Sequence, residues 1–179
     1  MKFNVATHQD VRRIADLHIE NWRETYRGSL TDHYLDHEIW DDRRQDWEQR
    51  LSHPAENQHV LMALDGDELA GFVCVYGRQH AAFGTLIENL HSSKLYRGKG
   101  IGKRLFLMAA EWSLKTHPED GLYLEVLASN TAAIGFYEAL GGVNVESNLW
   151  AAPGGGEVLE FSYYWENLKC LLSEQDQTK

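Results

Sequence analysis

Three alternating glycines lie inside the most basic stretch of this 179-residue chain. Gly98, Gly100 and Gly102 fall between Lys94 and Arg104, a segment that carries five of the chain's 17 lysines and arginines and no acid. A predicted strand precedes the segment and a predicted helix follows it. Glycines allow the backbone to approach a ligand closely, and the first N–H groups of a helix point toward an anion. The segment therefore predicts a phosphate-binding turn in a mixed α/β fold.

The rest of the chain is acidic and limits the classes of partner. Its 27 acidic residues against 17 basic ones give a net charge of −10, which disfavours a general nucleic-acid binder and docking on anionic lipid. No apolar run approaches the ~20 residues that span a bilayer, and the N-terminus lacks the apolar core of a secretory signal. Cys74 and Cys170 cannot form a disulfide framework. We expect a cytoplasmic protein with no nucleic-acid and no membrane partner.

Hydrophobic periodicity and turn residues predict the element order β-α-α-β-β-β-α-β-α-β-β. The expected strands cover residues 2–6, 58–64, 68–76, 83–92, 121–127, 143–150 and 158–165. The expected helices begin near Thr7, Thr31, Ile101 and Asn130. From residue 173 the chain is polar and is expected to fray. The sequence thus predicts one mixed α/β domain over residues 1–172 and a polar tail over 173–179.

Two common phosphate-binding motifs do not fit the glycine segment. A Walker loop requires Gly-x-x-x-x-Gly-Lys-Ser/Thr, but Arg104 follows Gly102 and Lys103, and position 97 is not glycine. A Rossmann fingerprint requires its third glycine where Lys103 stands. The pattern that does fit is Arg-x-x-Gly-x-Gly, from Arg97 to Gly102.

This pattern closely resembles the turn on which the GNAT superfamily of N-acetyltransferases binds the pyrophosphate of acetyl-CoA. A second match, Asn-x-x-Ala-x-x-Phe-Tyr, begins at Asn130, and the stretch 89–92 is similar to the superfamily's cofactor-contacting strand. The element order matches over roughly residues 2–166, and the specific motifs lie between 86 and 142. The resemblance implies a GNAT-like fold and an enzyme that uses acetyl-CoA as co-substrate.

The resemblance also implies a cofactor site made from three parts of the chain. The backbone of residues 90–92 would pair with the pantetheine arm, the glycine turn would hold the pyrophosphate, and Asn130 would contact pantetheine. As alternatives, Leu90 is a core residue, His91 a satisfied histidine and Asn130 only a helix N-cap. The implied cofactor-binding residues are Leu90, His91, Ser92, Arg97, Gly98, Lys99, Gly100, Ile101, Gly102, Lys103, Asn130, Ala133, Phe136 and Tyr137.

Tyr137 and Glu88 are the catalytic candidates. The superfamily commonly places a tyrosine at the position of Tyr137 to protonate the CoA thiolate, although a core aromatic is the alternative. The acceptor amine must lose a proton, and Glu88 is the candidate base, directly or through water, on the face of Leu90 unless a bulge intervenes. The acid common in the superfamily would stand at Leu86, so Glu88 is equally a structural or substrate-binding carboxylate, and His91 is the next candidate.

The acceptor is expected to be a primary amine of a small molecule or a peptide. In GNAT proteins the first two helices and the last hairpin usually line the acceptor pocket, although aromatic core packing is the alternative for each residue. The implied substrate residues are Trp22, Tyr26, Tyr34, Glu88 and Trp150. The acidic stretch 31–50 favours a cationic acceptor. His33 and His37 lack the glutamate of the zincin pattern, so no metal is expected.

Together these features predict an N-acetyltransferase in which the amine attacks the thioester directly within a ternary complex. A non-catalytic acyl-CoA-binding regulatory domain that keeps the same turn is the alternative. The exposed edges of the predicted sheet are compatible with a homodimer.

Overall fold

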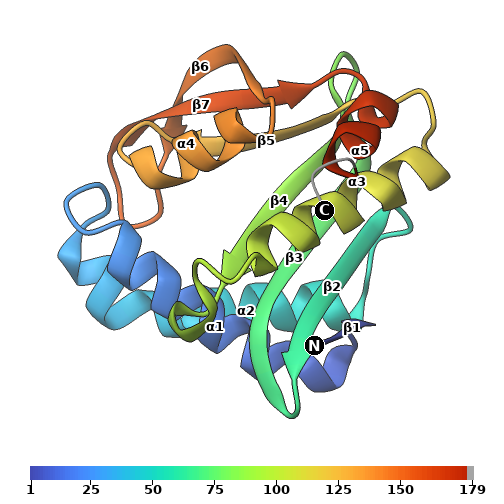
Figure 1. Cartoon of the computed structure of the whole chain (residues 1–179). Helices are drawn as coiled ribbons and strands as arrows, with labels where there is room; N and C mark the ends of the chain where they lie inside the picture. Colours follow the sequence, from blue (N-terminus) through green and yellow to red (C-terminus); the bar gives the residue numbers. More distant parts are fainter. Residues whose placement is uncertain (177–179) are drawn as a thin grey trace.

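The described residues form a seven-stranded mixed sheet. The computed structural model describes the backbone of residues 1–176 and the side chains of residues 1–173. The strands follow the order β1-β2-β3-β4-β5-β7-β6, and every neighbouring pair is antiparallel except β4 and β5 (Figure 1). Their bounds are β1 Lys2–Val5, β2 Gln58–Asp65, β3 Glu68–His80, β4 Gly84–Ser92, β5 Leu122–Leu127, β6 Val143–Ala151 and β7 Glu157–Trp165. The predicted mixed α/β class and the order of its elements are confirmed.

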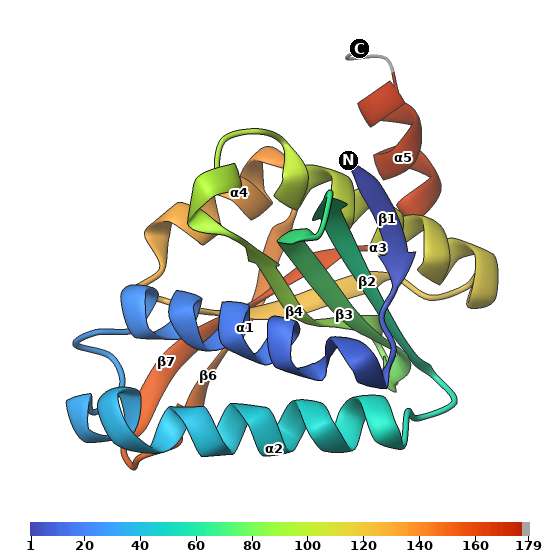
Figure 2. The ribbon, with the colours of Figure 1, turned by 90° about the horizontal axis from the view of Figure 1, so that it is seen from below.

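Helices cover both faces of the sheet. Figure 2 shows α1 and α2 on one face and α3, α4 and α5 on the other. The bounds are α1 Val11–Thr25, α2 Ile39–Ser52, α3 Ile101–Thr116, α4 Thr131–Ala139 and α5 Leu168–Asp176, with short helical turns at His8–Asp10, Tyr34–Glu38 and Lys94–Tyr96. No helix among residues 1–176 is both long and apolar enough to cross a membrane.

Helix α5 is an element that the sequence analysis did not predict. Residues 173–176 continue this helix, so a boundary after residue 172 would cut through it, and residues 177–179 lie outside the described part of the chain. Leu168 and Leu171 are 2% and 6% exposed, because they pack into the hydrophobic cluster beneath α3. Burial of these two side chains is the physical reason that the polar end of the chain is held in a helix.

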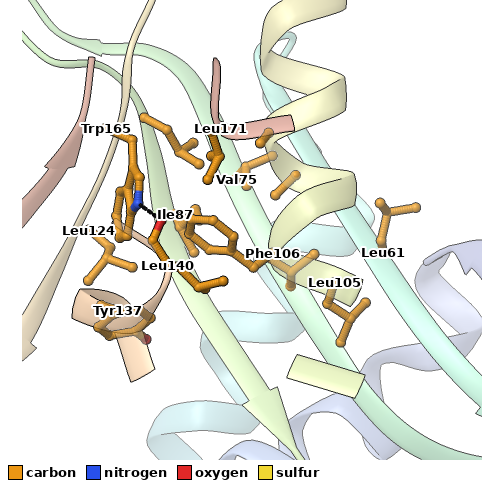
Figure 3. Packing of buried hydrophobic residues seen from close by; sticks show 14 of the residues in the cluster. Leu61, Val75, Ile87, Leu105, Phe106, Leu124, Tyr137, Leu140, Trp165 and Leu171 are labelled. Carbon is orange, nitrogen blue, oxygen red and sulfur yellow. Dashed lines mark hydrogen bonds between the residues drawn. The ribbon is translucent and has the colours of Figure 1, made fainter. Parts of the chain in front are cut away.

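Each face of the sheet has its own hydrophobic cluster. On the α3 side, Phe106 packs against Trp165 with 4.8 Å between ring centroids, and Trp165 Nε1 donates to the Leu140 carbonyl oxygen at 2.9 Å (Figure 3). On the α1 side, Trp47 packs against Phe72 with 5.2 Å between ring centroids. The sheet is therefore anchored independently on its two faces.

The parallel strands β4 and β5 separate after a short contact. Only two residue pairs join them, Thr85 with Leu122 and Leu86 with Tyr123, and Figure 1 shows β4 turning away from β5 and β7 beyond that point. A change of register between β3 and β4 leaves Glu88 as an extra residue, which is a β-bulge. The edge of β4 that faces β5 is consequently open along residues 87–92.

Candidate active site

A cleft of about 600 Å³ lies in the fork between β4 and β5. Its walls come from α1, the start of α2, both strands of the fork, the start of α4, β7 and the end of β6. Residues that are far apart in the sequence thus meet at the one place where the sheet is open. The backbone of β4 there offers polar groups that are not used by β5.

The glycine turn leads into helix α3 with its backbone in left-handed conformation. Gly98 and Gly100 have φ values of +74° and +79°, and a Cβ at either position would meet no atom within 4 Å. The conformation, not crowding, therefore requires glycine. The first bond of α3 runs from the Arg104 N–H to the Gly100 carbonyl at 3.0 Å. The N–H groups of residues 101–103 precede that bond and have no intrahelical acceptor, as anion binding at a helix start requires.

Contacts join the glycine turn to the rest of the predicted cofactor site. A Cβ on Gly102 would lie 3.4 Å from Ser92 Oγ and 3.8 Å from Phe136 Cζ, so β4, the turn and α4 meet there. Arg97 lines the cleft, where its Nη2 donates to Asn21 Oδ1 at 2.6 Å and lies 2.9 Å from Glu24 Oε2. These contacts fix the positively charged guanidinium of Arg97 at the rim of the cleft.

Several of the implied cofactor residues line the cleft itself. They are Leu90, His91, Ser92, Arg97, Asn130, Ala133 and Tyr137. Asn130 also caps α4, because its Oδ1 accepts from the Ala133 N–H at 3.2 Å. The ring of His91 lies 4.6 Å from that of His18 in α1, tilted by 35°, and burial together with the charge of Arg97 lowers the pKa of His91 to about 4. His91 is therefore neutral at physiological pH and a weak base.

Tyr137 reaches the cleft from α4. It is 9% exposed, its ring lies 6.1 Å from that of Trp165, and Figure 3 shows it at the lower edge of the cluster. Burial raises the pKa of its phenol well above the ordinary value, with a smaller contribution from Tyr26. Its hydroxyl makes no hydrogen bond with the described residues. Tyr137 thus keeps its proton at neutral pH and lies in the wall of the cleft.

Glu88 does not share the face of Leu90. The bulge turns Glu88 and its neighbour Asn89 toward the same side, where both accept from Arg50 of α2. Arg50 Nη2 is 2.9 Å from Glu88 Oε1, and Arg50 Nη1 is 3.1 Å from Asn89 Oδ1. Leu90 instead packs against the cluster beneath α3. The bulge is therefore the reason that the conditional expectation for Glu88 does not hold, although Glu88 still lines the cleft.

Three of the four aromatic residues expected at the acceptor site meet in the cleft. The Trp22 ring lies 5.3 Å from that of Tyr26 and 6.1 Å from that of Trp150, and all three line the cavity. Tyr34 does not line it. Tyr34 is 2% exposed, because its ring packs into the hydrophobic cluster on the α1 side of the sheet, and its hydroxyl donates to Asp42.

Two cleft carboxylates, Glu125 and Glu160, were not anticipated from the sequence. They stand on β5 and β7. Burial and the charge of Glu125 raise the pKa of Glu160 to about 7, and burial followed by the charge of Glu88 raises the pKa of Glu125. Each of them is an acid among apolar residues, in Leu-Tyr-Leu-Glu-Val-Leu for Glu125 and in Val-Leu-Glu-Phe for Glu160. This pattern is the signal from which the sequence could have identified them.

The described residues contain no group of three or more His, Cys, Asp or Glu side chains arranged to hold a metal ion. The rings of His33 and His37 are 5.1 Å apart on the surface, and His33 Nε2 is 3.2 Å from Glu38 Oε1. This histidine pair lies outside the residues that line the cleft.

Comparison with known families agrees with this geometry. A sequence model of the acetyltransferase (GNAT) family matches residues 15–142. The chain belongs to the GNAT acetyltransferase family. This family member is 34% identical over 90 residues to mycothiol acetyltransferase of Corynebacterium glutamicum (strain R), a match that covers 50% of this chain. The chain spans only 30% of that relative's length.

Solved structures show the same fold at low sequence identity. A putative GNAT acetyltransferase from Desulfovibrio desulfuricans superposes with a TM-score of 0.69 at 19% identity, over 92% of this GNAT chain and 98% of that one. PaiA N-acetyltransferase from Thermoplasma acidophilum, solved in complex with coenzyme A, gives a TM-score of 0.65 at 20% identity, over 89% and 98% of the two chains.

Proposed function

We propose that this GNAT protein moves the acetyl group of acetyl-CoA to a primary amine of a small molecule or a peptide, by direct attack within a ternary complex. The observation that carries the proposal is the fork between β4 and β5. Its cleft combines an open strand edge, a helix start with left-handed glycines and a proton-bearing phenol. The family membership supplies the reaction class.

The residues of the fork fit acetyl-CoA by their chemistry. The N–H groups of residues 101–103, with Arg97 nearby, would hold its pyrophosphate. The open edge of β4 along residues 90–92 would bond the amides of its pantetheine arm and polarise the acetyl carbonyl. The co-substrate supplies the activated thioester, and the protein positions it and moves protons.

Tyr137 would donate its proton to the sulfur as the C–S bond breaks. A thiol ionises near ~8.5, so a neutral phenol at the sulfur avoids the release of a free thiolate at neutral pH. The raised pKa of Tyr137 keeps the phenol protonated, and its 9% exposure limits competition from water. His91 is too weak a base to accept the amine proton efficiently at neutral pH.

Release of free thiol from acetyl-CoA in the presence of a primary amine tests the proposal. A panel of tryptamine, butane-1,4-diamine, kanamycin and a short lysine-containing peptide samples the aromatic and acidic walls of the cleft. We expect at least one amine to be acetylated, with product identity established by mass spectrometry. Binding of acetyl-CoA without transfer to any amine of the panel would instead support the regulatory alternative.

Tyr137→Phe tests the role of the phenol within this reaction. Removal of a general acid is expected to lower kcat about 100-fold, while KM for acetyl-CoA changes little. Tyr163→Phe is the matched control, because Tyr163 is also buried in the cluster beneath α3, does not line the cleft, and donates only to Glu138 at 2.9 Å. An equal loss of kcat in both variants would contradict the assignment.

A further inference from the structure

The carboxylates in the cleft differ in whether they already form an ion pair with an arginine. Glu88 accepts from Arg50 at 2.9 Å, and Asp42 accepts from Arg43 at 3.1 Å on both of its oxygens. Glu160, by contrast, has no hydrogen bond or ion pair with any described residue. A carboxylate that is free of a cation can take a proton without first breaking a bond to an arginine.

The position of Glu160 follows from the strand register. Glu160 pairs with Leu127 across β7 and β5. Counting along the fork from the Leu86–Tyr123 pair, with the extra residue of the bulge allowed for, brings Leu90 level with Val126. Glu160 therefore lies at about the same height along the fork as Leu90, in the part of β4 whose backbone would polarise the acetyl carbonyl.

The side chain of Glu160 faces the helices α1 and α2. Its neighbour Phe161 packs beneath α3, whereas Val158, two residues away, packs on the α1 side. Because side chains alternate along a strand, Glu160 shares the face of Val158. Tyr137 reaches the cleft from the α3 face. Glu160 and Tyr137 therefore lie on opposite sides of the fork, one toward the aromatic wall of Trp22 and the other toward the proposed cofactor.

The charged groups around Glu160 keep its environment negative. Glu125 from β5 raises the pKa of Glu160, Glu88 from β4 and Glu146 from β6 act on Glu125, and Glu160 in turn raises the pKa of Tyr26 at the end of α1. The cation on the α2 wall is Arg43, whose guanidinium is bonded to Asp42 and Asp46 and lies 5.0 Å from the centre of the Trp22 ring.

We infer that Glu160 is the base that removes the first proton from the acceptor ammonium, an assignment that rests on the proposed function. The carboxylate takes one N–H proton, which yields the neutral amine and a carboxylic acid. The amine nitrogen forms the bond to the acetyl carbon while the C–S bond breaks. Tyr137 gives its proton to the sulfur, which leaves as the CoA thiol. The second amine proton then passes through water to the Tyr137 phenolate, which yields the neutral amide and restores the phenol, and Glu160 returns its proton to solvent.

The pH dependence of kcat/KM tests this assignment with the amine of the panel that the wild type acetylates fastest. The base must be deprotonated, so the wild-type rate should rise with pH through an apparent pKa near 7. Glu160→Gln should lower kcat/KM about 100-fold and abolish this rise. Glu125→Gln should shift the rise to lower pH, because the loss of a neighbouring negative charge lowers the pKa of Glu160.

Two controls separate a catalytic role from a structural one. Glu157→Gln changes an exposed carboxylate of the same strand that does not line the cleft, and its kcat/KM should match that of the wild type. Binding of acetyl-CoA by Glu160→Gln, measured by calorimetry, should also be unchanged.

Carbon-13 NMR of protein labelled at the glutamate carboxyl carbon gives a reading that needs no acceptor. We expect the signal missing from Glu160→Gln to titrate near pH 7 in the wild type. Titration of that signal near the ordinary value of ~4.3 would overturn the assignment, as would a Glu160→Gln enzyme that keeps the wild-type rate and pH profile. If the wild type binds acetyl-CoA but acetylates no amine, the proposed function itself fails, and the assignment fails with it.

Discussion

His18 and His91 show how burial sets the charge of single residues at the cleft, which His91 lines and behind which His18 is buried. Trp47 Nε1 donates to His18 Nδ1 at 3.0 Å, so the ring hydrogen of the neutral His18 lies on Nε2. Burial lowers the pKa of both histidines, and the nearby charges of Arg43, for His18, and Arg97, for His91, act in the same direction. Two uncharged imidazoles, one from α1 and one from β4, therefore contact each other behind the wall of the cleft.

This arrangement predicts an acid-sensitive fold. A histidine whose pKa is lowered on folding binds more protons in the unfolded state, so stability is fully present above pH ~6.5 and is lost as the pH falls toward 4. His91, with a folded pKa of about 4, should contribute a loss on the order of 3 kcal/mol over that range. Urea unfolding of His91→Asn at pH 7 and pH 4.5 should show a smaller acid-induced loss than the wild type. The exposed-site variant His53→Asn should behave as the wild type does, and an acid response of His91→Asn as steep as that of the wild type would contradict the account.

At the scale of the elements, local signals in the sequence were sufficient for most helices and strands. Periodic apolar residues predicted α3, and the Asp65-Gly66-Asp67 turn predicted the β2–β3 hairpin, in which Gly66 has a φ of +62°. The bulge at Glu88 could not be predicted in this way, because it is defined by the register against β3 and held by Arg50, 38 residues earlier. The residues of the cleft divide similarly: several that belong to the sequence motifs, such as Arg97 and Asn130, line it, whereas the place of Glu160 in the cleft depends on strand pairing.

Helix α5 was missed because its apolar signal is short. Only the leucines 168, 171 and 172 face the cluster beneath α3, and polar residues follow them. These leucines stabilise a helix only because α3 and β7 supply the apolar surface against which they pack. Tyr34 does not line the cleft for a related reason, since its ring is buried in the cluster on the α1 side.

The packing of α5 can be measured with one leucine. Leu168→Ala removes a side chain that is 2% exposed and should lower the free energy of unfolding by about 3 kcal/mol, because it leaves a cavity beneath α3. Leu149→Ala, at a position on β6 that is 62% exposed, should change it by less than ~0.5 kcal/mol. Similar effects of the two substitutions in denaturant unfolding would show that α5 does not contribute to the core.

At the scale of the whole molecule, the fork separates two parts of the sheet that contribute different groups to the cleft. Strands β1–β4 pack against α1 and α2, and this part supplies Trp22, Tyr26 and the open edge of β4. Strands β5–β7 and α4 bring Tyr137 and the carboxylates of Glu125 and Glu160. The basic glycine turn contributes Arg97 to the cleft, whereas Glu125 and Glu160 line it from β5 and β7. Under the proposed function, the anionic co-substrate would bind at the basic turn and a cationic acceptor at the carboxylates.

Calorimetric titration with acetyl-CoA tests the central claim, that the glycine turn and the fork form an acetyl-CoA site. We predict saturable binding at one site by the wild type. Gly100→Asp places a negative charge at the start of α3 and should weaken binding at least about tenfold, or about 1.4 kcal/mol. Gly66→Asp is the matched control, since Gly66 also has a positive φ and a Cβ at this position would meet no atom within 4 Å, and it should bind as the wild type does. Absence of binding by the wild type, or equal affinity of Gly100→Asp and Gly66→Asp, would contradict the account.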